Sequence, residues 1–284
     1  MINERTPHEM TVVARAGSPA EAAVAGTSKA RRVGFNSAVV PAPNVYSYMS
    51  RLPAEAWGLD WLEHGTMSMR NRRPIYEGDV VTICASRIIE DQYGLSVRIV
   101  IRSAWGDEMA TGGAGLPREA PPAPELWAFP LFPMTVRRDI RPGGLRPGDR
   151  YASDDSLVLP EGHAQTLRDL DEAWPGYAAD GVVSPASLLR RAIRDRVASY
   201  NYPTPTAFVA AQAQHFSAAH IGDKLATSGV VIKAYEQRGH HCVDADQLVI
   251  ANGLKPIALL HTTSIYALRQ PDTQRAGAGS ADAA

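Results

Sequence analysis

Ile75-Tyr76-Glu77-Gly78-Asp79-Val80 has a counterpart 144 residues later, Ala219-His220-Ile221-Gly222-Asp223-Lys224. In both stretches a Gly-Asp pair, typical of a tight turn, stands at the start of an apolar run of the kind that forms a strand. The residues upstream also repeat, because Val39-Val40-Pro41 and Val182-Val183-Ser184-Pro185 precede the two stretches at nearly the same distance. These paired stretches predict that the chain contains two copies of one structural unit.

Two later correspondences keep the same order along the chain. Gly94 matches Gly239, and Ala104-Trp105-Gly106 matches Ala251-Asn252-Gly253. The offset between the copies drifts only from 143 to 147 residues over these pairs. Ordered matches at a nearly constant spacing are expected of a tandem duplication rather than of chance.

Each copy is predicted to contain a helix that begins near a proline, a residue tolerated in the first helical turn. In the second copy Leu189, Ile193 and Val197 recur at four-residue spacing, as on the buried face of an amphipathic helix. In the first copy Val45, Met49 and Leu52 follow a similar pattern. The charged residues of the second helix are expected mostly on the other, solvated side: Arg190, Arg191, Arg194, Asp195 and Arg196.

Strands are predicted after each helix. Met67 and Met69 alternate with polar residues, as do Ala211 and Ala213, and such alternation indicates half-buried strands. The remaining predicted strands are Val80–Ile89, Leu95–Trp105, Lys224–Tyr235, Cys242–Ala251 and Ile257–Leu268, with a weaker strand before each helix at Met10–Ala14 and Tyr151–Leu159. Each copy is therefore expected to be one helix and about five strands.

The predicted organisation is an N-terminal unit over residues 10–111 and a C-terminal unit over 146–269. The segment 112–145 between them is proline-rich and is expected to be an irregular linker that packs on the surface. The glycine-rich run Thr111–Gly115 is taken as the start of this linker. The ends, residues 1–9 and 270–284, are expected to be disordered.

Composition excludes several classes of protein. The 284 residues are 45% hydrophobic and 21% charged, with a net charge of −1, so there is no electrostatic signature of a nucleic-acid partner. No stretch approaches the ~18–20 apolar residues of a membrane span, and the N-terminal segment lacks the apolar core of a signal peptide. The two cysteines and the histidine spacing indicate neither a disulfide framework nor a metal site. We therefore expect a cytoplasmic protein without a metal.

One helix with an antiparallel sheet, duplicated in tandem, resembles the double hot-dog fold. This is an α+β fold in which each half is an antiparallel sheet wrapped around a long helix. More narrowly, residues 10–269 resemble the MaoC-like dehydratases and R-specific enoyl-CoA hydratases. The resemblance rests on the two Gly-Asp turns, on Arg146-Pro147-Gly148-Asp149 and on the closing strand from Gly253. It implies an acyl-thioester substrate, carried on coenzyme A or an acyl carrier protein between the two halves, no separate cofactor, and a homodimer or larger homo-oligomer.

The family's catalytic motif is Asp-x-Asn-Pro-x-His, and the matching frame here is Glu172-Ala173-Trp174-Pro175-Gly176-Tyr177. The proline matches and Glu172 keeps a carboxylate, but tyrosine replaces histidine at Tyr177. The resemblance implies Glu172 as the base and Tyr177 as a proton donor, since a phenol is a poor base at neutral pH. Two alternatives stay open. The frame could shift by one residue, which would make Asp171 the acid, or the segment could be a turn with two aromatic residues packed on the core.

The resemblance suggests further site residues around this motif. His215, or alternatively His163, could replace the missing histidine. Backbone N–H groups at the start of the second helix could bind the thioester oxygen, with Ser184 or Ser187 as the N-cap. The substrate-binding residues expected on these grounds are Ser184, Ala186, Ser187, the equivalent Asn44 of the first copy, and Arg190 and Arg72, whose guanidinium groups suit the phosphates of coenzyme A.

The function expected from this resemblance is hydration or dehydration of an acyl thioester with an altered acid/base motif. Two alternatives use the same scaffold: a hot-dog thioesterase, or an isomerase that moves a double bond. A third alternative is a non-catalytic acyl-binding subunit that pairs with an active chain.

Overall fold

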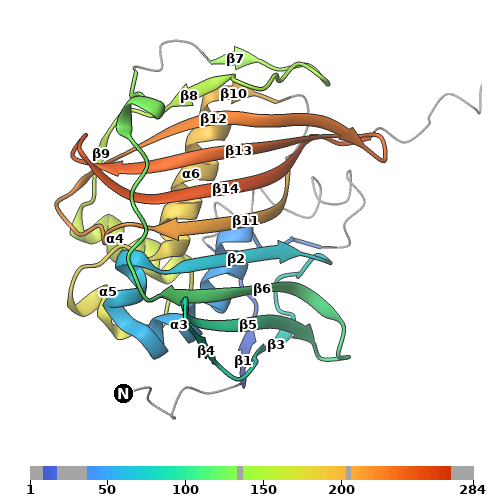
Figure 1. Cartoon of the computed structure of the whole chain (residues 1–284). Helices are drawn as coiled ribbons and strands as arrows, with labels where there is room; N and C mark the ends of the chain where they lie inside the picture. Colours follow the sequence, from blue (N-terminus) through green and yellow to red (C-terminus); the bar gives the residue numbers. More distant parts are fainter. Residues whose placement is uncertain (1–8, 18–36, 133–136, 203–205, 270–284) are drawn as a thin grey trace, which may run out of the picture.

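The computed structural model describes residues 9–17, 37–132, 137–202 and 206–269 (Figure 1). Its main feature is one large sheet, in which the strand order is β1-β3-β5-β6-β2-β11-β14-β13-β12-β8, with β4 paired to β5 and β9 paired to β12. Every pairing in this sheet is antiparallel, which is the arrangement expected for hot-dog proteins.

The N-terminal half of the sheet precedes the linker. Its strands are β1 (Glu9–Val13), β2 (Thr66–Asn71), β3 (Val80–Ala85), β4 (Ile89–Asp91), β5 (Gly94–Ser103) and β6 (Glu108–Pro117). Helix α3 (Ala42–His64) lies between β1 and β2 in the chain. The predicted strand Val80–Ile89 is thus two strands, because the chain leaves β3 after Ala85 and pairs again at β4.

The C-terminal half follows the linker. Its strands are β8 (Arg150–Ala152), β9 (Ser156–Leu157), β11 (Ala207–His215), β12 (Lys224–Gln237), β13 (His240–Ala251) and β14 (Lys255–Ala267). Its helices are α4 (Pro160–Asp169), α5 (Pro175–Ala179) and α6 (Pro185–Ser199). A 3-10 turn, η1 (Leu126–Ala128), and the small parallel pair β7 (Arg138–Asp139) and β10 (Tyr200–Asn201) complete the described elements.

The two halves repeat one strand order. Read from each edge of the sheet, β1-β3-β5-β6-β2 corresponds to β8-β12-β13-β14-β11, and the halves meet where β2 pairs with β11. Isolated bridges also repeat, since Val39 pairs with Tyr76 and Val182 pairs with His220. The structure thus contains the internal repeat that the sequence predicts.

The two Gly-Asp turns are built in the same way. The Asp79 carboxylate accepts a hydrogen bond from the Tyr76 backbone N–H at 2.8 Å, and Asp223 does the same for His220 at 2.9 Å. Gly78 and Gly222 have φ angles of 86° and 95°, a region in which side chains are strained. A carboxylate and a glycine are therefore both needed at this corner, which explains why the pair marks the repeat.

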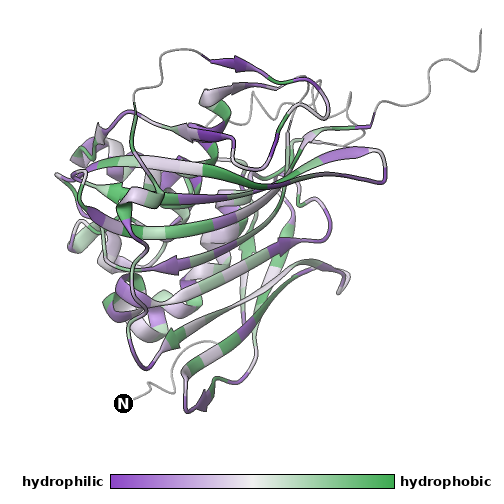
Figure 2. Ribbon diagram, turned by 45° about the horizontal axis from the view of Figure 1, so that its top comes forward, coloured by the Kyte–Doolittle hydropathy of each residue, from purple (hydrophilic) through white to green (hydrophobic). Residues whose placement is uncertain are grey.

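Both long helices lie on one face of the sheet, behind the strands in Figure 1. Apolar and polar residues alternate along the strands (Figure 2). The core of the N-terminal half includes Val45, Met49 and Leu52 of α3, as predicted, together with Met67 and Met69 of β2. No helix of the described residues combines the length and apolarity needed to cross a bilayer.

Helix α6 departs from its prediction. Arg191, Asp195 and Arg196 were expected on the solvated side, but all three are buried against the sheet. Asp195 forms an ion pair with Arg191 at 3.2 Å and accepts a hydrogen bond from the Thr227 hydroxyl at 2.8 Å. The correction has a physical reason, since charged side chains can be buried when paired partners compensate them, and periodicity does not report such partners.

Strand β6 corrects the predicted linker boundary. The linker was expected from residue 112, but residues 112–117 belong to β6, where all of them pair with β5 and residues 112–115 also pair with β2. The sequence did not predict this strand because it is rich in glycine, which is a poor strand former. Glycine is nevertheless required here, since a Cβ on Gly112 would collide with the Ser68 carbonyl oxygen and lie 3.0 Å from the Met49 methyl group.

We expect Gly112→Ala to destabilise the protein by about 2 kcal/mol, because the added carbon meets backbone rather than a flexible side chain. Urea unfolding measures the change. Gly162→Ala in α4 is the matched control, since a Cβ there meets no other atom within 4 Å, and it should leave stability unchanged or slightly raised. Equal effects of the two substitutions would contradict this account of β6.

The rest of the linker crosses the outer face of the sheet, the face turned away from the helices (Figure 1). Phe129 packs there on Leu248 and Ile250, and the Ser228 hydroxyl donates a hydrogen bond to the Pro130 carbonyl at 2.9 Å. The predicted surface packing of this segment is therefore present at Phe129, whereas Trp127 is exposed.

Candidate active site

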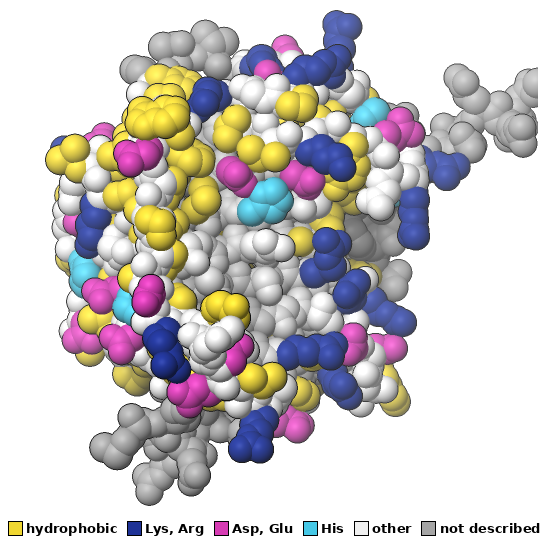
Figure 3. Space-filling model, viewed as in Figure 1, with side chains coloured by type: hydrophobic (Ala, Val, Ile, Leu, Met, Phe, Trp, Pro, Cys, Tyr) yellow, Lys and Arg dark blue, Asp and Glu magenta, His cyan; other side chains and the backbone are white. Residues whose placement is uncertain are grey.

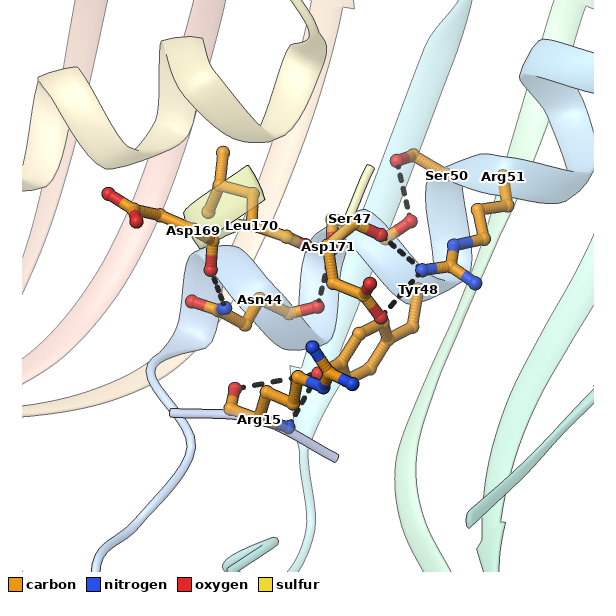
Figure 4. A network of polar contacts seen from close by, with 9 residues as sticks. All are labelled: Arg15, Asn44, Ser47, Tyr48, Ser50, Arg51, Asp169, Leu170 and Asp171. Atoms are coloured by element: carbon orange, nitrogen blue, oxygen red, sulfur yellow. Dashed lines mark hydrogen bonds and ion pairs between the residues drawn. The ribbon is translucent and has the colours of Figure 1, made fainter. Parts of the chain in front are cut away.

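The segment Asp169-Leu170-Asp171-Glu172 carries the predicted catalytic carboxylate, and helix α3 holds it in place (Figure 4). Asn44 donates a side-chain hydrogen bond to the Asp169 carbonyl at 2.7 Å, and the Ser47 hydroxyl donates to the Leu170 carbonyl at 2.5 Å. Asn44 was expected to bind substrate. Its side chain instead fixes the backbone of the loop, so it acts as a positioning residue.

Two arginines anchor the same loop through its carboxylates. Arg51 forms an ion pair with Asp171 at 2.9 Å and also donates to the Asp171 carbonyl (Figure 4). Arg190 forms an ion pair with Asp169 at 3.4 Å, with both side chains largely buried. Arg190 was expected to contact coenzyme A phosphates, but the structure gives it a carboxylate partner within the protein. Asp171, the alternative acid, is likewise paired.

The Glu172 carboxyl group has no such partner. The residue as a whole is half-buried, but both carboxyl oxygens are shielded from solvent. The Ser184 hydroxyl is close enough to stabilise the carboxylate, yet neither oxygen makes a well-aligned hydrogen bond among the described residues. Burial raises its pKa from 4.5 to about 8, with the Ser184 hydroxyl and Arg51 lowering it in part and Asp171 raising it. Buried polar groups are almost always hydrogen-bonded, so an unpaired carboxyl is a candidate functional group.

Tyr177 lies close enough to Glu172 for the charge of the carboxylate to raise the pKa of its hydroxyl. Burial raises the pKa of the Tyr177 hydroxyl well above 10, Glu172 and Tyr46 raise it further, and the nearby Ser50 hydroxyl lowers it in part. The hydroxyls of Tyr177 and Tyr46 are both buried, and neither makes a well-aligned hydrogen bond among the described residues. The Tyr177 hydroxyl therefore stays protonated near neutral pH. It can donate a hydrogen bond to the substrate, but it cannot act as a base. The structure thus brings together the two catalytic residues predicted from the motif.

The first turn of α6 lies beside this pair. Ser184 is the N-cap, because its hydroxyl accepts the Ser187 backbone N–H at 3.2 Å, so the cap is Ser184 rather than Ser187. Leu188 N–H donates to the Ser184 carbonyl. The Ala186 N–H has no hydrogen-bond partner within the described residues. Of the backbone donors expected in this turn, Ala186 is therefore the one left to bind an oxygen.

His215 does not join the site. It lies at the end of β11, where its Nδ1 is 3.0 Å from the Trp61 carbonyl and its ring packs edge-on against Trp61. His215 is not among the groups that shift the pKa values of Glu172 and Tyr177. Burial lowers the pKa of His215 to about 4. The expected replacement for the missing histidine is therefore a neutral core residue.

His163 is closer to the candidate site than His215. Its Nε2 lies 2.9 Å from the Tyr177 carbonyl oxygen, and the side chain is buried. This contact ties α4 to α5 and so supports the backbone from which Tyr177 projects. Arg72, expected to bind phosphates, lies elsewhere, in a groove on the outer face of the sheet together with Arg70 and Lys233.

Several residues of the site lie outside the motif, and of these only Asn44 was singled out from the sequence, for a different role. Tyr46 and the loop anchors Asn44, Ser47 and Arg51 come from the first copy, more than 120 residues before Glu172. The three anchors recur at helical spacing, so a polar stripe on an otherwise apolar helix was a visible signal. Its partner, the backbone of the 169–171 segment, could not be read from the sequence.

Comparisons with known proteins agree with the fold. No family profile and no curated protein matches this sequence. A solved MaoC-like dehydratase aligns with 93% of this chain and 99% of its own, at 14% identity and a TM-score of 0.60. A Mycobacterium tuberculosis protein described as having a double hotdog fold aligns over 93% and 95% of the two chains, at 13% identity and a TM-score of 0.58.

A 12:0-ACP thioesterase from Umbellularia californica also has this fold, with 90% and 92% of the two chains aligned, 10% identity and a TM-score of 0.52. At such identities the likeness concerns the fold. The chain is thus a double hot-dog protein, of the fold shared by MaoC-like dehydratases and acyl thioesterases.

Proposed function

We propose that this protein hydrates the α,β-double bond of an enoyl thioester and catalyses the reverse dehydration. The observation that supports this best is the buried Glu172 carboxyl, which has no ion-pair partner among the described residues, beside the protonated Tyr177 hydroxyl. A carboxyl whose pKa lies close to neutral can both accept and return a proton, which an exposed glutamate does poorly.

In the proposed reaction the Glu172 carboxylate takes a proton from water while the water oxygen bonds to the β-carbon. The electron pair of the double bond moves toward the thioester carbonyl, whose oxygen becomes negative. Protonated Glu172 then delivers its proton to the α-carbon, which restores the carboxylate. Dehydration runs through the same steps in reverse. One carboxyl group therefore serves both proton transfers, which suits a site that lacks the family's histidine.

The developing negative oxygen needs hydrogen-bond donors. Tyr177 offers a hydroxyl that burial keeps protonated, and Ala186 offers a backbone N–H at the start of α6. Neither makes a well-aligned hydrogen bond to another group among the described residues, although the Ser50 hydroxyl lies near that of Tyr177. Donors already in place for a developing charge contribute most where water is excluded, as at this buried carboxyl.

The fold comparison supports a substrate class, since one neighbour is named a MaoC-like dehydratase and another a 12:0-ACP thioesterase. We propose an acyl thioester of coenzyme A or of an acyl carrier protein. Thioester hydrolysis is the second candidate, because the thioesterase neighbour shares the fold and Glu172 could equally activate water for attack on the carbonyl carbon.

The test incubates the purified protein with crotonyl-CoA and longer enoyl-CoAs and follows two signals. Hydration lowers the absorbance of the enoyl thioester and releases no thiol. We expect this pattern for at least one chain length. Thiol release without hydration would support the thioesterase instead. No turnover with any thioester of the panel would refute both activities and leave an acyl-binding role.

A further inference from the structure

A groove of about 610 Å³ crosses the outer face of the sheet, away from the helices and from Glu172. Its sides come from strands of both halves, with Arg70 and Arg72 at the end of β2, and Lys233 on β12 with Arg238 in the turn that follows. Residues that alternate with the buried Met69, Ala211 and Leu260 must point to this outer face. The linker covers a different part of the same face, around Phe129.

The lining of the groove is strongly basic. It contains four Lys or Arg side chains and no carboxylate, although the chain as a whole carries a net charge of −1. None of these four cations has an ion-pair partner within 4 Å among the described residues. Figure 3 shows Lys and Arg side chains gathered on the right of this face, beside a hollowed centre. Such a concentration of unpaired charge attracts anions.

The cations are placed by the strand register rather than scattered. Arg70, Ala210, Thr263, Asp244 and Lys233 form one continuous row across five strands. At a strand spacing of ~4.8 Å the backbones of Arg70 and Lys233 are about 19 Å apart, so their side chains project from the outer face at the two ends of this row and both line the groove.

Neighbouring side chains hold two of the charged groups at the groove in place. The Lys233 ammonium lies 4.9 Å from the Tyr235 ring centre, which holds it toward the groove. The one acid in the row, Asp244, is the register partner of Lys233 and borders the groove, where it accepts hydrogen bonds from the Thr263 hydroxyl at 2.8 Å and the Tyr235 hydroxyl at 3.5 Å. The four cations of the lining outnumber this carboxylate.

The groove also has an apolar floor, formed by Val209, Cys242 and Ile265. A volume of this size falls within the ~300–1,000 Å³ typical of small-molecule sites. A cationic rim suits phosphates, because guanidinium groups bind them by paired hydrogen bonds. An apolar floor beside that rim suits a flat, uncharged ring. The two features together favour a small molecule with both parts over a simple inorganic anion.

We propose that this groove binds a nucleoside polyphosphate, with its phosphates between Arg70, Arg72 and Lys233 and its base over the floor. The site lies on the opposite face of the sheet from Glu172, so it is separate from the proposed acyl site. A protein with this groove occupied would bind an anionic ligand in addition to the proposed acyl thioester.

The test is calorimetric titration of the full chain with ADP at low ionic strength. We expect one ADP per chain, with an affinity that falls as salt rises, since screening weakens contacts with phosphates. The double variant Arg70→Gln/Lys233→Gln should weaken ADP at least tenfold. The matched control is Arg98→Gln/Arg118→Gln, which removes the same charge from exposed residues outside the groove.

Three outcomes would overturn the proposal. The first is no measurable binding of ADP by the unaltered protein. The second is an equal loss of affinity in the control variant, which would reduce the effect to overall charge. The third is pyrophosphate binding as tightly as ADP, because the apolar floor would then contribute nothing and the site would take an inorganic anion only.

Discussion

Replacing Glu172 by glutamine is expected to reduce hydration and dehydration of enoyl thioesters at least a hundredfold. Glutamine keeps the shape of the side chain but cannot accept a proton, and positioned acid–base groups contribute roughly 10²–10⁴ to a rate. Steady-state kinetics on the thioester that the unaltered protein turns over best would measure the loss. Because the carboxyl reacts with water and the α-carbon, the loss should fall on kcat more than on KM.

The dependence of kcat/KM on pH provides a second, independent test of Glu172 as the base. Burial raises the pKa of Glu172 to about 8, and the proposed mechanism starts from its carboxylate in both directions. In the unaltered protein kcat/KM should therefore rise with pH and level off above about pH 8. Glu161→Gln, an exposed glutamate of α4, serves as the control and should change neither quantity. Full activity of Glu172→Gln would rule out this residue as the base.

The second large effect concerns stability. Since the pKa of Glu172 is raised from 4.5 in the unfolded chain to about 8 in the folded one, the folded state holds the extra proton between these values. Stability then falls as pH rises through this window. From pH 5 to pH 8 the unfolding free energy should lose about 3 kcal/mol through this residue, because each pKa unit corresponds to about 1.4 kcal/mol.

His215 contributes in the opposite direction. Its pKa is lowered from 6.5 to about 4 by burial, so its contribution to stability is complete above pH 6.5 and is lost as pH falls toward 4. The contributions of Glu172 and His215 change in opposite directions between pH 5 and 6.5. A plot of the total unfolding free energy against pH will therefore not show either contribution separately. Urea unfolding of the unaltered protein and of Glu172→Gln across pH 5–8 isolates the Glu172 part by difference. A difference that stays constant with pH would mean that this carboxyl titrates normally.

Much of the fold was predictable from the sequence because its corners need particular residues. The Gly78-Asp79 and Gly222-Asp223 turns each combine a left-handed glycine with a carboxylate that accepts a backbone N–H. Local requirements of this kind leave a readable pattern at a constant offset. Strand β6 left no such pattern, since Gly112 is required by contacts with Ser68 and Met49, which are distant in the chain.

The residues of the candidate site also fall into those with local signals in the sequence and those defined by contacts distant in the chain. Glu172 and Tyr177 stand five residues apart, so a motif comparison could pair them, and Ser184 as an N-cap is equally local. The sequence by itself determined the repeat and the turns, and it singled out this pair as the candidate catalytic residues. Only the tertiary structure decided that Asn44 and Arg190 anchor the loop, that His215 is a neutral core residue, and that Arg72 belongs to a groove on the other face. The reason is physical: a side chain's partner and burial depend on which distant strands and helices pack together, and residue type and spacing along the chain do not report them.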